Sequence, residues 1–222
     1  MRKSDRIPEI LRRLRKAYGR PAPLKRSDPV DELIRTVLSQ NTSDANSLGA
    51  FSALKRAFHR WVDVLAATDT QVASVIRHGG LAAIKAARIR NILAEIKRRQ
   101  GALSLSFLED IKPDEALEYL KAFKGVGPKT AVCVLLFSFG KPVMPVDTHI
   151  FRVTKRLGLI DKDSTVEEAH GRLSEIVPKR LIYEFHLGII EHGRRTCKAR
   201  APLCGACVLY GLCRFESKGK YR

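Results

Sequence analysis

The sequence predicts an all-α protein. In most segments of the 222-residue chain, apolar residues recur at intervals of three and four, the period of a helix with one buried face. Prolines and capping residues stand where these segments begin, and glycines or prolines follow where they end. No run of alternating apolar and polar residues is long enough to predict a strand, and the short run at 143–146 is interpreted as a connector.

Two amphipathic helices are expected first. One carries an apolar stripe from Ile7 to Leu14 and ends before Pro21. The next begins after Asp28, a capping residue followed by proline, and stops in the polar run at 39–44, which also suits the N-cap of a third helix. The stripe of the second helix is the strongest in the chain and consists of Val30, Leu33, Ile34, Val37 and Leu38.

The middle of the chain predicts short helices at 61–66 and from Asp69 to the glycines at 79 and 80. A longer helix follows, and most of its many basic residues, which include Lys85 and Arg88, are expected on a solvated face. Beyond the break at 140–142, further helices are expected at residues 148–157, 166–176 and 181–192, the second of them opened by Ser164 and Glu167 in the spacing of a capping box.

The segment at about 113–138 predicts a helix, a hairpin and a second helix. Two glycines flank Val126, and glycine tolerates positive φ and lets another backbone approach closely. Pro128 suits the first turn of the second helix, at 128–137. Free N–H groups and a helix N-terminus attract anions, so a nucleic-acid phosphate fits this turn. The hairpin residues are Gly125, Val126 and Gly127, and the lysines around them are Lys121, Lys124 and Lys129.

A formal net charge of +18, from 41 Lys and Arg against 23 Asp and Glu, indicates a polyanionic partner. A basic surface that serves only solubility is the alternative on charge alone. No segment approaches the roughly 20 apolar residues that span a bilayer, and no signal-peptide core follows the first residue, so no membrane partner is expected. We therefore expect an intracellular protein with reduced cysteines.

A Gly-x-Gly alone is a weak signal, but here a lysine follows the second glycine by two residues. An aspartate stands 18 residues (147 − 129) further on, in Val-Asp-Thr-His. In these motifs the chain resembles the helix-hairpin-helix-GPD superfamily of DNA glycosylases, and the pair of Lys129 and Asp147 resembles its endonuclease III branch. The resemblance extends from about Val30 to Cys213 and includes His149, which is expected to contact the DNA backbone.

This resemblance implies two helical lobes. One is a helical barrel at 27–142, which contains the helix-hairpin-helix, and the other combines residues 1–26 with residues 143–222. Double-stranded DNA with damaged bases or abasic sites is the implied partner, bound in a cleft between the lobes. We expect a monomer that acts in the cytoplasm at the nucleoid.

Four of the five cysteines stand close together near the end of the chain, separated by six, two and five residues. Four thiolates this close in an intracellular chain indicate metal ligands. Zinc is the alternative, but Cys₄ zinc sites usually show two Cys-x-x-Cys knuckles and this chain has one. The spacing resembles the [4Fe-4S] cluster loop of endonuclease III, which would shape a cationic loop against DNA. The implied ligands are Cys197, Cys204, Cys207 and Cys213, while Cys133 is expected in the core.

Lys129 and Asp147 suit the chemistry of N-glycosidic cleavage. The bond breaks through an oxocarbenium-like sugar that a carboxylate stabilises, and Asp147 is the candidate. An amine that attacks C1′ forms a Schiff base and permits β-elimination of the 3′ phosphate, and Lys129 is the candidate. The alternatives are an N-cap role for Asp147 and plain phosphate binding for Lys129.

An extruded nucleotide leaves a gap in the base stack. The resemblance implies that one loop fills it with a polar residue, here Gln40 or Asn41, and another with an apolar wedge, here Leu81. The sequence departs from the usual pattern in both loops, which leaves open both the register of the amide and the preferred lesion. A core position is the alternative for Leu81.

Three functions compete at this stage. The first is a bifunctional glycosylase and abasic-site lyase that removes oxidised pyrimidines, and it is favoured. The second is a monofunctional glycosylase, but such relatives lack the lysine and carry a glutamate before the Gln-rich turn, where this chain has Arg35 and Thr36. The third is a non-catalytic helix-hairpin-helix module, which the presence of Lys129 with Asp147 disfavours.

Overall fold

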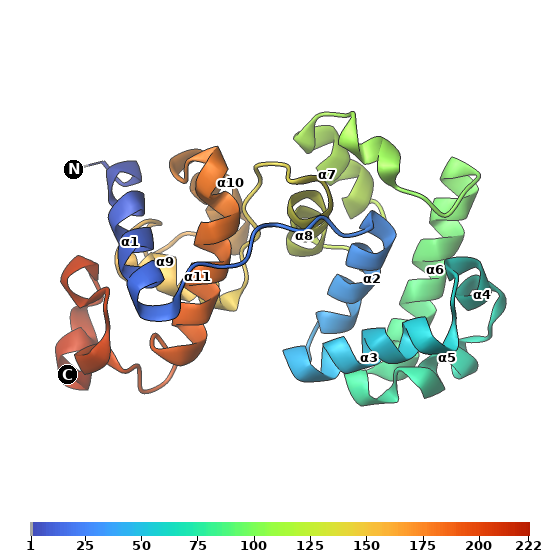
Figure 1. Cartoon of the computed structure of the whole chain (residues 1–222), viewed down its shortest axis with the longest axis horizontal. Helices are drawn as coiled ribbons and strands as arrows, with labels where there is room; N and C mark the ends of the chain where they lie inside the picture. Colours follow the sequence, from blue (N-terminus) through green and yellow to red (C-terminus); the bar gives the residue numbers. More distant parts are fainter. Residues whose placement is uncertain (1) are drawn as a thin grey trace. The chain divides into compact units, whose positions relative to one another are not determined.

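The computed structural model describes residues 2–222, which are helical without any β-strand among them (Figure 1). The all-α prediction is confirmed. The described chain divides into two compact units, one formed by Lys25–Lys141 and the other by the residues up to Leu24 together with Pro142–Arg222. None of the helices among residues 2–222 is long and apolar enough to cross a membrane.

The unit of residues 25–141 contains seven α-helices joined by short turns. Two 3-10 turns, Arg77–Gly79 and Ser106–Glu109, complete it. The helices are α2 (Pro29–Ser39), α3 (Asp44–Ala57), α4 (Trp61–Ala66), α5 (Asp69–Val75), α6 (Ala82–Gln100), α7 (Pro113–Lys121) and α8 (Pro128–Phe139).

Helices α2 and α8 pack against each other and form the centre of this unit. The stripe predicted for α2 is buried, each of its five apolar residues being at most 1% exposed. Helix α8 is apolar on all sides and buries nine of its residues, as expected for a helix enclosed by its neighbours. Apart from the half-buried Phe137, only the first turn of α8, at Pro128 and Lys129, is accessible to solvent.

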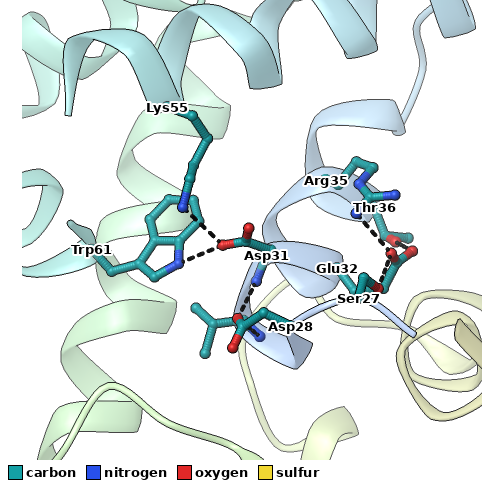
Figure 2. Close-up of polar contacts among 9 residues, drawn as sticks. Ser27, Asp28, Asp31, Glu32, Arg35, Thr36, Lys55 and Trp61 are labelled. Carbon is teal, nitrogen blue, oxygen red and sulfur yellow. Dashed lines mark hydrogen bonds and ion pairs between the residues drawn. The ribbon is translucent and has the colours of Figure 1, made fainter. Parts of the chain in front are cut away.

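Polar contacts fix the start of α2 (Figure 2). Asp28 accepts from the N–H groups of the first turn, at 2.9 Å each, as the sequence predicts for this cap. Asp31 accepts from the Nζ of Lys55 at 3.1 Å and from the indole N–H of Trp61 at 2.9 Å, which ties α2 to α3 and α4.

The other unit contains four α-helices and the cysteine-rich end of the chain. Helix α1 packs against α11, and Arg15 forms a two-pronged ion pair with Glu184 between them. Helices α9 and α11 also pack together. The helices are α1 (Ile7–Tyr18), α9 (Thr148–Leu157), α10 (Val166–Ile176) and α11 (Ile182–Arg195).

The cap of α10 differs from its prediction by one residue. Thr165, rather than Ser164, is the N-cap and accepts from the N–H of Glu168 at 3.2 Å. The carboxylate of Glu168 accepts in return from the N–H of Thr165 at 2.8 Å. Both pairs have capping-box spacing, and the first turn forms where Ala169 and Leu173 face the core.

We expect Thr165→Ala to lower the free energy of unfolding by about 1 kcal/mol, because it removes one of the two acceptors of the capping box. Ser164→Ala should leave stability within experimental error. Thermal unfolding of the purified variants measures the difference. Equal losses in the two variants would contradict the observed register of the cap.

Candidate active site and cysteine pocket

The hairpin between α7 and α8 is anchored by apolar side chains and exposed at its glycines. Phe123 and Val126 are at most 5% exposed, and the N–H of Val126 donates to the carbonyl of Phe123 at 3.0 Å. Gly125 adopts a φ of 86°, in the region that favours glycine. The tight turn predicted from the sequence is therefore present.

The two hairpin glycines serve different purposes. A Cβ on Gly125 would lie 2.2 Å from the Nε of Arg88, so this glycine makes room for an arginine of α6. Gly127 is extended and has nothing within 4 Å of such a Cβ. The main chain at Gly127 therefore faces open space, which a ligand can approach closely.

Lys129 is the second residue of α8 and is exposed. It stands where the helix dipole is positive and where N–H groups of the first turn lack helical acceptors. Lys124, in the hairpin, is also exposed. Lys121 is engaged locally, because its Nζ lies 2.8 Å from a carboxylate oxygen of Glu118. The structure thus gathers cationic groups at the hairpin, with Lys129 at the helix end.

The structure separates the roles of the two residues that follow α2. The amide N–H₂ of Gln40 donates to the carbonyl of Gly125 and to the hydroxyl of Thr130, both at 3.2 Å. Its carbonyl accepts from Arg88. Gln40 therefore holds the hairpin, whereas Asn41 is exposed and has a φ of 54°.

Leu81 is 51% exposed, so its interpretation as a core leucine is wrong. It also has a positive φ, 51°, a conformation that costs a residue with a Cβ roughly 1–2 kcal/mol. The turn before it lies beside the loop of Asn41, because a Cβ on Gly80 would be 3.9 Å from the hydroxyl of Thr42. Two exposed, left-handed residues therefore stand on neighbouring loops of this unit.

The prediction that the basic residues of α6 are solvated is wrong for Lys85, which is 2% exposed. Burial, with the nearby charge of Arg88, lowers the pKa of the Lys85 ammonium. A signal was present in the sequence, because Lys85 precedes Ile89, Ile92 and Ile96 at helical intervals and so lies on their stripe.

Asp147 is the N-cap of α9 and is partly buried. Its Oδ1 accepts from the N–H of Ile150 at 2.7 Å. The cap role therefore exists, and it is compatible with a catalytic one because it engages Oδ1. Asp147 belongs to the unit that contains α9, and Lys129 belongs to the unit of residues 25–141.

Helix α9 is bonded to the cysteine loop through Arg152. This guanidinium lies 3.1 Å from the Nδ1 of His149 and donates to the carbonyls of Gly193 and Cys197 at 2.9 Å each. His149 also packs on Gly193, because a Cβ added to Gly193 would lie 2.9 Å from the Cβ of His149. His149 is therefore held from the side of α11, and its contact with DNA stays a prediction.

The four clustered cysteines line a single pocket, whereas Cys133 is buried in α8 as expected. No group of three or more His, Cys, Asp or Glu side chains within residues 2–222 is arranged to hold one metal ion. A single zinc needs all its sulfurs about 2.3 Å away, whereas a cluster binds each thiolate through a different iron. Four thiols that line one pocket suit such a cluster.

Cationic and N–H groups surround this pocket. Arg156 directs Nη1 to the sulfur of Cys197 at 3.3 Å, and the Nε2 of His192 lies 3.6 Å from the sulfur of Cys207. Arg6 lies next to the pocket rather than in its lining: Nη2 donates to the carbonyl of Leu212, beside Cys213, and Nη1 is a buried donor without a partner among the described residues. Such donors match the negative charge of a thiolate-bound cluster, so the residues present fit that group.

The polar contacts continue from His192 to α1. Its Nδ1 lies 2.9 Å from the hydroxyl of Tyr18, which lies 2.7 Å from the hydroxyl of Thr196. Burial lowers the pKa of His192 to about 4, so the imidazole is neutral at physiological pH. Neither His192 nor the arginines were identified from the sequence, because no local pattern distinguishes them from other core and surface residues.

Comparisons with known proteins agree with this geometry. A model of the HhH-GPD superfamily of base excision DNA repair proteins matches residues 34–179. A model of the iron-sulfur binding domain of endonuclease III matches residues 197–213, the span of the four cysteines. The prediction of a [4Fe-4S] cluster is confirmed by this match.

Full-length relatives extend the agreement. Endonuclease III of Thermotoga maritima is 34% identical over 97% of both chains. A DNA glycosylase-like protein of Arabidopsis thaliana is 39% identical over 76% of this chain, which spans only 58% of that longer relative. Two solved structures cover 100% of both chains at 31% identity: a non-covalent endonuclease III–DNA complex, with a TM-score of 0.83, and a trapped endonuclease III–DNA covalent intermediate, with a TM-score of 0.81.

We expect the purified protein to carry iron and acid-labile sulfide at about four of each per chain, as a cubane bound by four cysteines requires. Colorimetric iron and sulfide assays on anaerobically prepared protein measure this ratio. One zinc per chain, with no sulfide, would contradict the cluster.

Proposed function

The chain belongs to the HhH-GPD superfamily of base excision DNA repair proteins and to its endonuclease III branch, and we propose that it is a bifunctional DNA glycosylase and abasic-site lyase. Its substrate is duplex DNA that carries oxidised pyrimidines or abasic sites. The observation that carries the proposal is the position of Lys129, exposed in the first turn of α8 directly after the open main chain at Gly127.

Lys129 is the nucleophile of this mechanism. Its neutral amine attacks C1′ of the extruded nucleotide, the bond to the base breaks, and the departing base takes the electron pair. Loss of the ring oxygen bond at C1′ then gives a Schiff base between Lys129 and the opened sugar. The iminium makes a 2′ proton acidic, and its removal expels the 3′ phosphate. Water finally hydrolyses the imine and frees Lys129.

Asp147 stabilises the positive charge that develops on the sugar as the base departs. A carboxylate that is held by a helix N-terminus keeps a fixed direction, and the bond from Ile150 supplies that constraint. The cap thus orients the group that the chemistry needs.

The hairpin binds the DNA backbone through main-chain N–H groups at its glycines, assisted by the exposed Lys124. Lys121 contributes less to this contact, because it forms an ion pair with Glu118. His149 is a further candidate for a backbone contact from the other unit. Residues that touch phosphates position the duplex and do not select the lesion.

Asn41 and Leu81 fill the gap that the extruded nucleotide leaves. Asn41 is preferred to Gln40 because the Gln40 side chain already bonds to Gly125, Thr130 and Arg88, whereas Asn41 is exposed. Leu81 offers an exposed apolar side chain that can enter the stack.

A monofunctional glycosylase is the second candidate, and the geometry does not favour it. The carboxylate nearest in sequence to the Gln40 turn within α2 is Glu32, which is 5% exposed and bonded to the hydroxyl of Ser27 at 2.9 Å (Figure 2). Thr36, one turn later, is also buried. Neither residue offers an accessible acid for base excision, whereas Lys129 is accessible.

A DNA substrate also implies action inside the cell, at the nucleoid.

We expect Lys129→Gln to abolish the covalent adduct that borohydride traps on a duplex with an abasic site, because only an amine forms a reducible Schiff base. Electrophoresis of the protein–DNA adduct measures its yield, and DNA affinity should be retained. Lys112→Gln, at an exposed lysine before α7, is the matched control and should give the wild-type yield. A wild-type yield from Lys129→Gln would assign the nucleophile to another residue.

We expect Asp147→Asn to lower the single-turnover rate of base excision by about a hundredfold or more, because the charge that stabilises the sugar cation is lost. Asparagine is as good an N-cap as aspartate, so α9 should keep its start and its stability. Binding to a duplex with an abasic analogue should remain within about threefold of wild type, since that measurement involves no cation. An unchanged excision rate would restrict Asp147 to capping.

A further inference from the structure

We propose that Lys85 is a positioning residue that holds both gap-filling loops, the loop of Asn41 and the turn of Leu81, in one arrangement. The inference rests on the function proposed above, because it assigns Lys85 to the step in which a nucleotide leaves the stack. Lys85 itself is buried and does not touch DNA.

The contacts of Lys85 are unusual for a lysine. Its Nζ donates to the carbonyl of Leu38 at 2.7 Å and to the carbonyl of Gly79 at 2.8 Å. Both acceptors are uncharged main-chain groups, and the side chain is 2% exposed. An ammonium removed from water without a carboxylate carries a large desolvation cost. A methionine or leucine would fill the same place on the apolar stripe without that cost, so packing does not explain the lysine.

The two carbonyls belong to the bases of the two loops. Leu38 lies in the last turn of α2, where carbonyls lack helical donors and the helix dipole is negative, and Asn41 follows three residues later. Gly79 precedes Leu81 by two residues. A single ammonium therefore joins the end of α2, 47 positions before Lys85 in the sequence, to the turn that presents Leu81.

The two loops need such a constraint. Asn41 and Leu81 both have positive φ values, 54° and 51°, which residues with a Cβ adopt only where the surroundings fix them. The turn at Gly79 packs directly against α3, because a Cβ added to Gly79 would lie 2.9 Å from the Cβ of Ala50. The hydrogen bonds of Lys85 hold the end of α2 against this turn, so the side chains of Asn41 and Leu81 keep a fixed spacing.

The experiment compares affinities for two duplexes, one undamaged and one with a tetrahydrofuran abasic analogue. We expect Lys85→Met to leave undamaged-duplex affinity within about twofold of wild type and to lower analogue affinity about tenfold, because the gap-filling pair loses its spacing. Lys55→Met is the matched control. It removes another lysine that joins helices of this unit, through Asp31, at the opposite end of α2 (Figure 2).

A double-mutant cycle with Leu81→Ala separates positioning from general stability. If Lys85 acts through Leu81, the two substitutions together should cost clearly less analogue affinity than the product of their separate effects. Lys55→Met combined with Leu81→Ala should lower analogue affinity by the product of their separate effects. Independent effects of Lys85→Met and Leu81→Ala, or an unchanged affinity ratio in folded Lys85→Met, would overturn the proposal.

Lys85→Gln provides the same test if Lys85→Met does not fold, because glutamine keeps donors but is too short to reach both carbonyls. Wild-type protein that binds the two duplexes equally would also overturn the inference. The borohydride adduct reports on the proposed lyase function separately. If the wild-type protein forms the adduct but the cycle shows no coupling between Lys85 and Leu81, only the role of Lys85 is rejected. If the cycle shows coupling but the wild-type protein forms no adduct, only the lyase function is rejected.

Discussion

The unit of residues 25–141 depends on the burial of helix α8. Nine of its residues are inside, so the helix cannot turn or slide without exposing apolar side chains, each of which contributes roughly 1.5–3 kcal/mol by its burial. Its first turn is consequently fixed in direction while it faces solvent. The hairpin before α8 is fixed in the same way, because its side chains Phe123 and Val126 are buried. Lys129, the proposed nucleophile, therefore lies on a fixed helix turn, whereas a lysine on a mobile loop would have to be ordered at each turnover.

Helix α6 provides a second level of order in this unit. Lys85 bonds to the end of α2 and to the turn before Leu81, and Arg88, one turn later, bonds to Gln40 and fits against Gly125. The hairpin and both left-handed loops are thus held from one helix. Since each bond uses a main-chain or amide group rather than an exposed ion pair, these contacts are little affected by salt.

In the other unit, α9 connects Asp147, the carboxylate proposed for catalysis, with the cysteine pocket. Asp147 begins the helix, Arg152 bonds to the carbonyl of Cys197, and Arg156 reaches the sulfur of Cys197 and the carbonyl of Lys198. A cluster that shapes the cysteine loop therefore also supports the helix that orients Asp147. Between Cys197 and Cys213 only Pro202, Cys204 and Leu209 are buried, so the cluster supplies order that packing alone would not.

Sequence by itself determined which segments are helical, because the apolar period, prolines and caps act over neighbouring residues. Helices α9 and α10 begin and end where the pattern predicts, and the cap of α10 was wrong by one residue only because Ser164 and Thr165 both offer the required spacing. Sequence also singled out Lys129, Asp147 and the four cysteines, whose spacing is local in the chain, although the catalytic roles stay predictions. Only the tertiary structure decided that Gln40 is engaged while Asn41 is exposed, that Lys85 is buried, and that Arg156 and His192 line the cysteine pocket. The Gln40 and Lys85 contacts join residues as many as 90 positions apart, and no local pattern encodes which distant carbonyl or hydroxyl a side chain meets once the helices have packed.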